Sequence, residues 1–89
     1  MNTTNQHTKI LIADDHPVFR KGVKQILEGN GTCTVVAEAT DGEAAMQVLR
    51  EQEIDIAVLD LDMPRMNGFD VMKHTGLENI QADVVVITM

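Results

Sequence analysis

Residues 9–17 read KILIADDHP, a short apolar run that stops at two acids and is followed by a proline. Apolarity that is continuous rather than alternating is typical of a strand covered on both faces, as in parallel sheets. Pro17 suits the first turn of a helix, and apolar side chains recur at helical spacing over residues 19–27. The stretch therefore predicts a strand over 9–13 that leads into a helix.

The same order of elements recurs along the rest of the chain. Residues 33–37, 54–59 and 84–88 predict three further strands. A capping-box pattern at residues 40–43 (TDGE) opens a second helix, and residues 69–76 predict a third. Alternating strands and helices predict βαβ units, and hence one α/β domain with a parallel sheet and right-handed crossovers.

The chain is short and acidic. Its 89 residues allow one small domain, and 14 acidic against 7 basic side chains give a formal charge of −7. That charge argues against nucleic-acid contacts from this segment. Residues 1–8 are polar, so we expect a disordered start and no signal peptide. The apolar runs are too short to span a bilayer, which favours a cytoplasmic protein without membrane contacts.

Three acids stand at the predicted carboxyl ends of strands: Asp14 and Asp15 after the first, and Asp60 after the third. Ligands of open parallel sheets bind beyond these ends, where the strand order reverses. In a flavodoxin-like, doubly wound order, 2-1-3-4-5, the first and third strands are neighbours, so the three carboxylates converge. Their repulsion favours a bound cation, and an oxygen-only cluster with open positions suits Mg²⁺.

Taken singly, each of these features has an ordinary structural explanation. The acidic pair alone is most often a charge pair at a helix N-terminus, and the acids at 60–62 alone are most often solvated loop residues. Thr88 alone is a good strand residue. His16 is next to the acids and able to contact a metal, but we favour its role as the residue that starts the helix. The combination carries more weight, because one fold gathers all of these residues at one edge.

Four segments, in this order and spacing, resemble the receiver domains of bacterial response regulators of the NarL/FixJ group. Residues 12–22 (IADDHPVFRKG) resemble their opening, and residues 35–45 (VVAEATDGEAA) their second strand and helix. Residues 58–68 (VLDLDMPRMNG) resemble the phosphoacceptor segment, and residues 85–89 (VVITM) the fourth strand. The resemblance covers residues 9–89 without a large gap.

The resemblance implies a role for each matching residue. Asp60 is expected to accept a phosphoryl group from a partner sensor histidine kinase. Asp15 and Asp60 are expected to bind Mg²⁺, Asp14 to hold the ion through water, and the backbone carbonyl of Asp62 to complete the protein ligands. Thr88 is expected to be the hydroxyl that moves toward the phosphoryl group. The module would then be no ordinary enzyme, since it catalyses only its own phosphorylation and dephosphorylation.

The sequence departs from the family pattern at its end. Receivers continue into a fourth helix, a fifth strand with a lysine and an aromatic switch residue, and a fifth helix. We therefore expect an incomplete receiver over residues 9–89, with four of five strands and, in a longer parent protein, a helix-turn-helix DNA-binding domain. The edge at residues 84–87 would favour a homodimer or a swapped dimer. Met89 is expected to shield Asp60, so that Met89→Ala shortens the lifetime of the phosphoryl group.

Two other functions remain open. Residues 56–62 (IAVLDLD) resemble the opening motif of haloacid-dehalogenase-type phosphatases, in which Asp60 would attack and Asp62 would be the general acid/base. Pro64 stands where that family has Thr or Val, and the motif lies on the third strand behind an acidic pair, which disfavours this interpretation. The other alternative is an interaction module that has lost phosphorylation.

Overall fold

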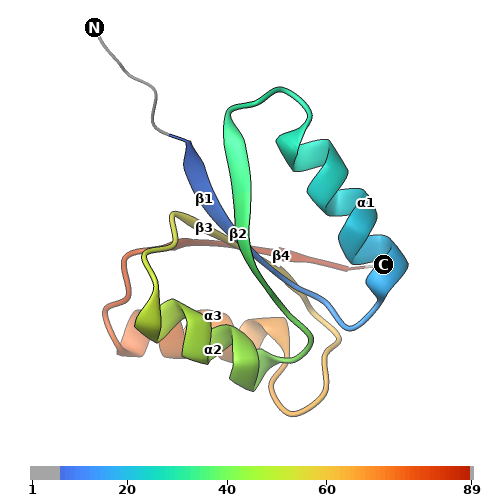
Figure 1. The fold of residues 1–89 in the computed structure, drawn as a ribbon. Helices are drawn as coiled ribbons and strands as arrows, with labels where there is room; N and C mark the ends of the chain where they lie inside the picture. Colours follow the sequence, from blue (N-terminus) through green and yellow to red (C-terminus); the bar gives the residue numbers. More distant parts are fainter. Residues whose placement is uncertain (1–6, 89) are drawn as a thin grey trace, which may run out of the picture.

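The computed structural model describes residues 7–88, which form a parallel sheet with helices on both faces (Figure 1). Neighbouring strands are all parallel, in the order β2-β1-β3-β4. This order confirms the predicted flavodoxin-like α/β fold for the described residues. The elements in chain order are β1 (Thr8–Ala13), α1 (Pro17–Glu28), β2 (Cys33–Ala39), α2 (Gly42–Glu51), β3 (Ile56–Asp60), α3 (Gly68–Leu77) and β4 (Asp83–Ile87).

Two expectations concern the ends of the chain. Most of the predicted disordered start, residues 1–8, lies outside the described residues, although Thr8 already belongs to β1. Met89, with the substitution proposed for it, also lies outside them. None of the three helices formed by residues 7–88 has the length and apolar character that a membrane crossing requires.

The larger part of the core lies between the sheet and the pair α2 and α3. Alternate residues of the central strands, such as Leu11 and Leu59, point to this face and are fully buried. They pack against Met46 and Leu49 of α2 and Val71 of α3. The apolar residues of α2 therefore form the face that packs on the sheet.

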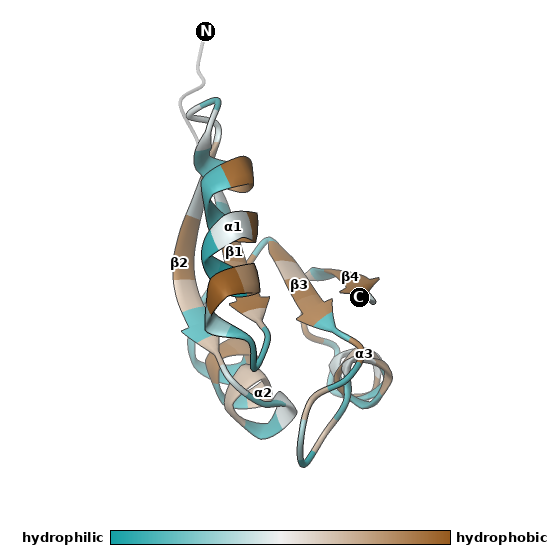
Figure 2. Cartoon of the chain, turned by 90° about the vertical axis from the view of Figure 1, so that its right-hand side faces the viewer, coloured by the Kyte–Doolittle hydropathy of each residue, from teal (hydrophilic) through white to brown (hydrophobic). Residues whose placement is uncertain are grey.

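Among the described residues, α1 alone covers the opposite face of the sheet, and it packs mainly on β2 and β1. The buried cluster on this face is small and consists of Ile10, Ile12 and Val58. Apolar residues of α1 lie on the side toward β3 and β4 (Figure 2). Together with residues of those strands they line an open groove. Ile26, one of the apolar residues at helical spacing, is 79% exposed because no described residue covers this groove.

The helix caps differ in part from the sequence prediction. The predicted capping box at residues 40–43 is wrong, because Asp41 is the N-cap of α2 and accepts a 2.8 Å hydrogen bond from the Ala44 N–H. Aspartate caps helices at least as well as threonine. The α3 helix does have a capping box, formed by Asn67 and Asp70, where the sequence indicated only a turn.

Candidate functional site

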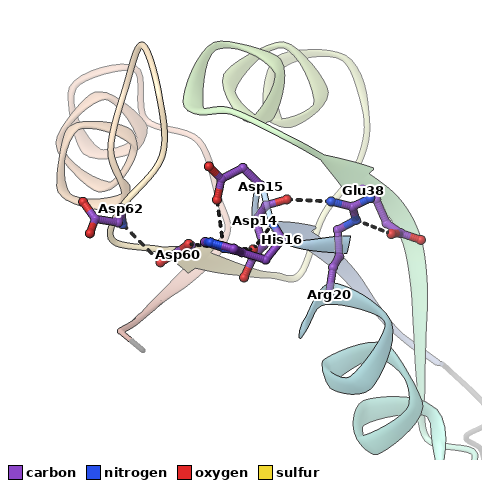
Figure 3. Close-up of polar contacts among 7 residues, drawn as sticks. All are labelled: Asp14, Asp15, His16, Arg20, Glu38, Asp60 and Asp62. Atoms are coloured by element: carbon purple, nitrogen blue, oxygen red, sulfur yellow. Dashed lines mark hydrogen bonds and ion pairs between the residues drawn. The ribbon is translucent and has the colours of Figure 1, made fainter. Parts of the chain in front are cut away.

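The sheet register brings the predicted acids to one edge. Ala13 of β1 pairs with Leu59 of β3, so Asp14 and Asp60 follow an aligned pair of residues. Their side chains are only 1% and 3% exposed. Asp15 lies beside them with a side chain that is 35% exposed. Potential ligand atoms of these three acids and of His16 all lie within 4.8 Å of one another (Figure 3).

The two buried carboxylates each have one oxygen held by a backbone amide. The His16 N–H donates to Asp14 Oδ1 at 2.6 Å, and the Asp62 N–H donates to Asp60 Oδ1 at 3.1 Å. The second oxygens, Asp14 Oδ2 and Asp60 Oδ2, are buried without a hydrogen-bond partner among residues 7–88. Burying an ionised oxygen without a partner is costly. The two oxygens therefore fit a bound cation, and Mg²⁺ prefers such oxygen ligands.

His16 contributes a ring nitrogen to the same cluster. Its Nδ1 lies 3.0 Å from Asp15 Oδ1, 3.2 Å from Asp14 Oδ1 and 3.7 Å from Asp60 Oδ2. The residue is also the N-cap of α1, but its side chain forms no capping hydrogen bond. The structure thus agrees with the helix-start interpretation and also turns the imidazole toward the acids.

Arg20 is a residue of the site that the sequence interpretation missed. Its Nη1 donates to the carbonyl oxygen of Asp14 at 2.7 Å, and its Nε donates to Glu38 Oε1 of β2 at 2.8 Å (Figure 3). The side chain is only 17% exposed. Its position about one turn into the helix that follows the acids is the one sequence feature that points to this role.

Asp62 and Thr88 lie at the same edge but outside the cluster of ligand atoms. The Asp62 carboxylate is exposed and points away from the other acids (Figure 3). Thr88 is exposed and follows Ile87, the register partner of Asp60 in β4. The Leu61 N–H donates to the Ile87 carbonyl oxygen at 2.8 Å, which ties the end of β3 to β4.

The loop between β3 and α3 is fixed to α2 by an ion pair. Arg65 Nη2 donates to Asp41 Oδ2 at 2.7 Å, and Arg65 adopts a left-handed φ of 69°. Long side chains rarely adopt this backbone conformation, so the contact to Asp41 helps to hold it. The Ala44 N–H and the Arg65 guanidinium lower the pKa of the Asp41 carboxyl.

Gly68 allows the start of α3 to approach β3, the strand that ends at Asp60. A Cβ atom at this position would lie 2.8 Å from the Asp60 carbonyl oxygen and 3.2 Å from Val86 Cγ1. The Gly68 N–H also donates to the Leu61 carbonyl oxygen at 3.1 Å. The close approach requires a residue without a side chain, and it fixes the backbone that carries Asp60.

A doubly wound sheet with an acidic pair after β1 and a buried aspartate after β3 defines the class of receiver-type signalling modules. The comparisons agree, and the chain belongs to the response regulator receiver domain family, whose model matches residues 10–89. Membership implies a phosphoacceptor function in two-component signalling.

Similar proteins are response regulators of the NarL and NarP type. The nitrate/nitrite response regulator protein NarP of Escherichia coli is 37% identical over 81 residues, which are 91% of this chain and 38% of that protein. The E. coli protein NarL is 36% identical over 80 residues, or 90% of this chain and 37% of NarL. This chain therefore spans less than half the length of these relatives.

A solved structure agrees at the level of the domain. The receiver domain of the response regulator NarL from Mycobacterium tuberculosis superposes with a TM-score of 0.91 at 35% identity. The match covers 93% of this chain and 67% of that domain structure.

Proposed function

We propose that Asp60 accepts a phosphoryl group from a partner sensor histidine kinase in the presence of Mg²⁺. The observation that carries the proposal is the buried Asp60 Oδ2 oxygen, which accepts no hydrogen bond from residues 7–88 and lies against Asp14, Asp15 and His16. In the proposed step, Asp60 Oδ2 forms a bond to phosphorus while the bond between phosphorus and the donor breaks, and the donor leaves with the electron pair. The product is an acyl phosphate on Asp60.

The residues around Asp60 have separate proposed tasks. The Asp62 N–H orients the carboxylate through Oδ1, which leaves Oδ2 free to attack. Asp15 is the proposed direct ligand of Mg²⁺, Asp14 holds the ion through water, and the Asp62 carbonyl is a further ligand. When bound, Mg²⁺ neutralises charge on the transferring phosphoryl group. Thr88 is the proposed hydroxyl that reaches the phosphoryl group and changes the surface seen by a partner.

The whole protein is proposed to be a transcription regulator. The relatives named above are nitrate/nitrite response regulators that extend well beyond the match. We assign residues 9–89 to the receiver and expect a helix-turn-helix domain in the longer protein to contact DNA. This proposal also places the protein in the cytoplasm, where its kinase donates the phosphoryl group. A homodimer or swapped dimer through β4, the edge strand of the described sheet, belongs to the same proposal.

The test is phosphorylation by a small donor. The purified chain is incubated with MgCl₂ and acetyl phosphate, and the intact mass is measured over time. We expect the mass to increase by one phosphoryl group in the wild type and not in Asp60→Asn. Asp62→Asn is the matched control, because it removes a neighbouring carboxylate and keeps the backbone N–H that orients Asp60. Chelation of Mg²⁺ with EDTA should abolish the increase.

The same experiment separates the two alternatives. Continuous release of phosphate, lost on Asp62→Asn, would indicate a phosphatase in which Asp62 is the general acid/base. An unchanged mass in the wild type would indicate an interaction module without phosphorylation. A phosphoryl group that remains on Asp60→Asn would contradict the assignment of the phosphoacceptor.

A further inference from the structure

We propose that His16 Nδ1 is an additional direct protein ligand of the acidic site and makes the site prefer Mn²⁺ to Mg²⁺. The proposal rests on the proposed function, because it uses the same cluster of Asp14, Asp15 and Asp60. It adds a nitrogen donor to a set that the sequence indicated to be made of oxygen alone.

The distances fit a shared ion. Neighbouring ligands of an octahedral divalent ion, each roughly 2.1 Å from the metal, lie about 3 Å apart. His16 Nδ1 lies 3.0 Å from Oδ1 of Asp15, the proposed direct ligand, which is a separation of this size. At 3.7 Å, Asp60 Oδ2 is also within the spread of one coordination shell.

A hydrogen bond from the imidazole does not by itself provide partners for all of the buried carboxylate oxygens of the cluster. A proton on Nδ1 has two nearer acceptors, the Oδ1 oxygens of Asp14 and Asp15. It would leave the buried Asp14 Oδ2 and Asp60 Oδ2 oxygens without a partner. One cation among the four side chains can satisfy these oxygens and accept the ring nitrogen as a ligand.

The backbone holds His16 in place for this role. A proline restricts the residue before it to extended conformations, and His16 has φ −109° and ψ 102°. Pro17 therefore fixes the backbone that directs the ring toward the acids. The side chain is 54% exposed, so one side of the site remains open to water and to a phosphoryl donor.

A nitrogen donor changes which ion the site prefers. Mg²⁺ binds oxygen ligands and keeps several waters. Mn²⁺ shares the preference for oxygen, but as a transition ion it also accepts a nitrogen donor, although more weakly than the later members of the series do. Replacing the imidazole should therefore weaken binding of Mn²⁺ and leave binding of Mg²⁺ nearly unchanged. Loss of a residue that only orients a metal ligand already lowers affinity by about tenfold or more, so loss of the imidazole is expected to lower the affinity for Mn²⁺ by at least about tenfold.

The test measures binding of MnCl₂ to the full chain by electron paramagnetic resonance, with MgCl₂ as competitor. His16→Asn is the test variant, since asparagine is a good N-cap and keeps the start of α1. His74→Asn is the matched control, because His74 is exposed on α3 and outside the cluster. Pulsed measurements on the bound Mn²⁺ report directly whether a nitrogen atom is coordinated.

We expect coupling between bound Mn²⁺ and a nitrogen atom in the wild type and in His74→Asn. In His16→Asn we expect this coupling to be lost. The ratio of Mn²⁺ affinity to Mg²⁺ affinity should also fall about tenfold in His16→Asn. If both ions bind but neither the coupling nor the ratio depends on His16, this inference is wrong and the proposed function stands. If neither ion binds the wild type, the metal site itself is refuted, and the inference with it.

Discussion

Arg20 links three parts of the molecule at the acidic edge. It lies on α1, donates to the backbone carbonyl of Asp14 after β1, and pairs with Glu38 on β2. Arginine can make both contacts at once because its donors form a planar fork, which a lysine ammonium lacks. We infer that Arg20 is a positioning residue that fixes the backbone of the acidic pair.

Arg20→Ala is therefore expected to weaken Mg²⁺ binding by about tenfold, comparable to the loss of other residues that orient metal ligands. Arg20→Lys should recover only part of this loss. Isothermal titration calorimetry with MgCl₂ measures the effect. Lys24→Ala is the control, because Lys24 belongs to the same helix as Arg20 and also pairs with Glu38. Its Nζ lies 3.7 Å from Glu38 Oε2. Equal losses of Mg²⁺ affinity in Arg20→Ala and Lys24→Ala would refute a specific role for the contact between Arg20 and the Asp14 carbonyl oxygen.

The positions of the acids could be predicted from the sequence, whereas the contacts that orient them could not. Asp14 and Asp60 are recognisable because each directly follows a buried apolar strand, and parallel strands end at one edge. The side-chain directions of His16 and Arg20 depend on rotamers and on neighbours from other elements. Arg20 has its partner Glu38 on a different strand, so helical spacing alone assigns it to a solvated face.

At the level of elements, the N-terminus of α2 is connected to the loop between β3 and α3. Asp41 caps α2 through the Ala44 N–H and also pairs with Arg65 from the loop. Both contacts favour the ionised carboxylate and hold the pKa of Asp41 below its ordinary value of 3.8. The resulting stabilisation is fully present above that ordinary value and is lost as the pH falls through the lowered pKa.

Asp41→Asn is expected to lower the melting temperature at pH 7 by roughly 4 °C, because the neutral amide caps the helix but pairs weakly with Arg65. The difference in melting temperature between variant and wild type should shrink as the pH is lowered below 3.8, because the wild-type carboxyl becomes protonated as the pH falls through its lowered pKa. Thermal melts followed by circular dichroism at pH 7 and over an acidic pH series measure it. A difference in melting temperature that does not change with pH would mean that the charge of Asp41 contributes nothing to the stability of the fold.

The elements themselves were largely predictable, and their ends were less so. Apolar runs bounded by acids and turn residues predict all four strands of the described sheet, and the flavodoxin-like arrangement expected for such a chain predicts their order. The start of α2 was placed one residue early, because Thr40 and Asp41 are both good caps and the sequence does not show that Arg65 pairs with the second. Whether β4 pairs with another chain stays a prediction.

For the whole molecule, the two faces of the sheet differ in how completely they are covered. Leu11 and Ile10 are neighbours on β1 that point to opposite faces, and both are buried. Leu11 belongs to the large cluster under α2 and α3, whereas Ile10 lines the open groove beside α1. Truncation of Leu11 leaves a closed cavity, but truncation of Ile10 only widens a groove that water enters.

We therefore expect Leu11→Ala to reduce the free energy of unfolding by about 4 kcal/mol, and Ile10→Ala by about 2 kcal/mol. Urea denaturation of the two variants and the wild type measures both values. The comparison is matched because leucine and isoleucine lose the same number of carbon atoms on replacement by alanine. Equal losses of unfolding free energy in the two variants would show that the groove beside α1 is closed to water in solution.

The strand order has a consequence for how the chain acquires its metal ligands. Asp14 and Asp60 are separated in sequence by two helices and a strand, and they meet only because β1 pairs with β3. The unfolded polypeptide therefore has no preformed ligand set. An ion that binds only the folded chain must raise its melting temperature, so acquiring the ion and acquiring the tertiary structure are one linked equilibrium.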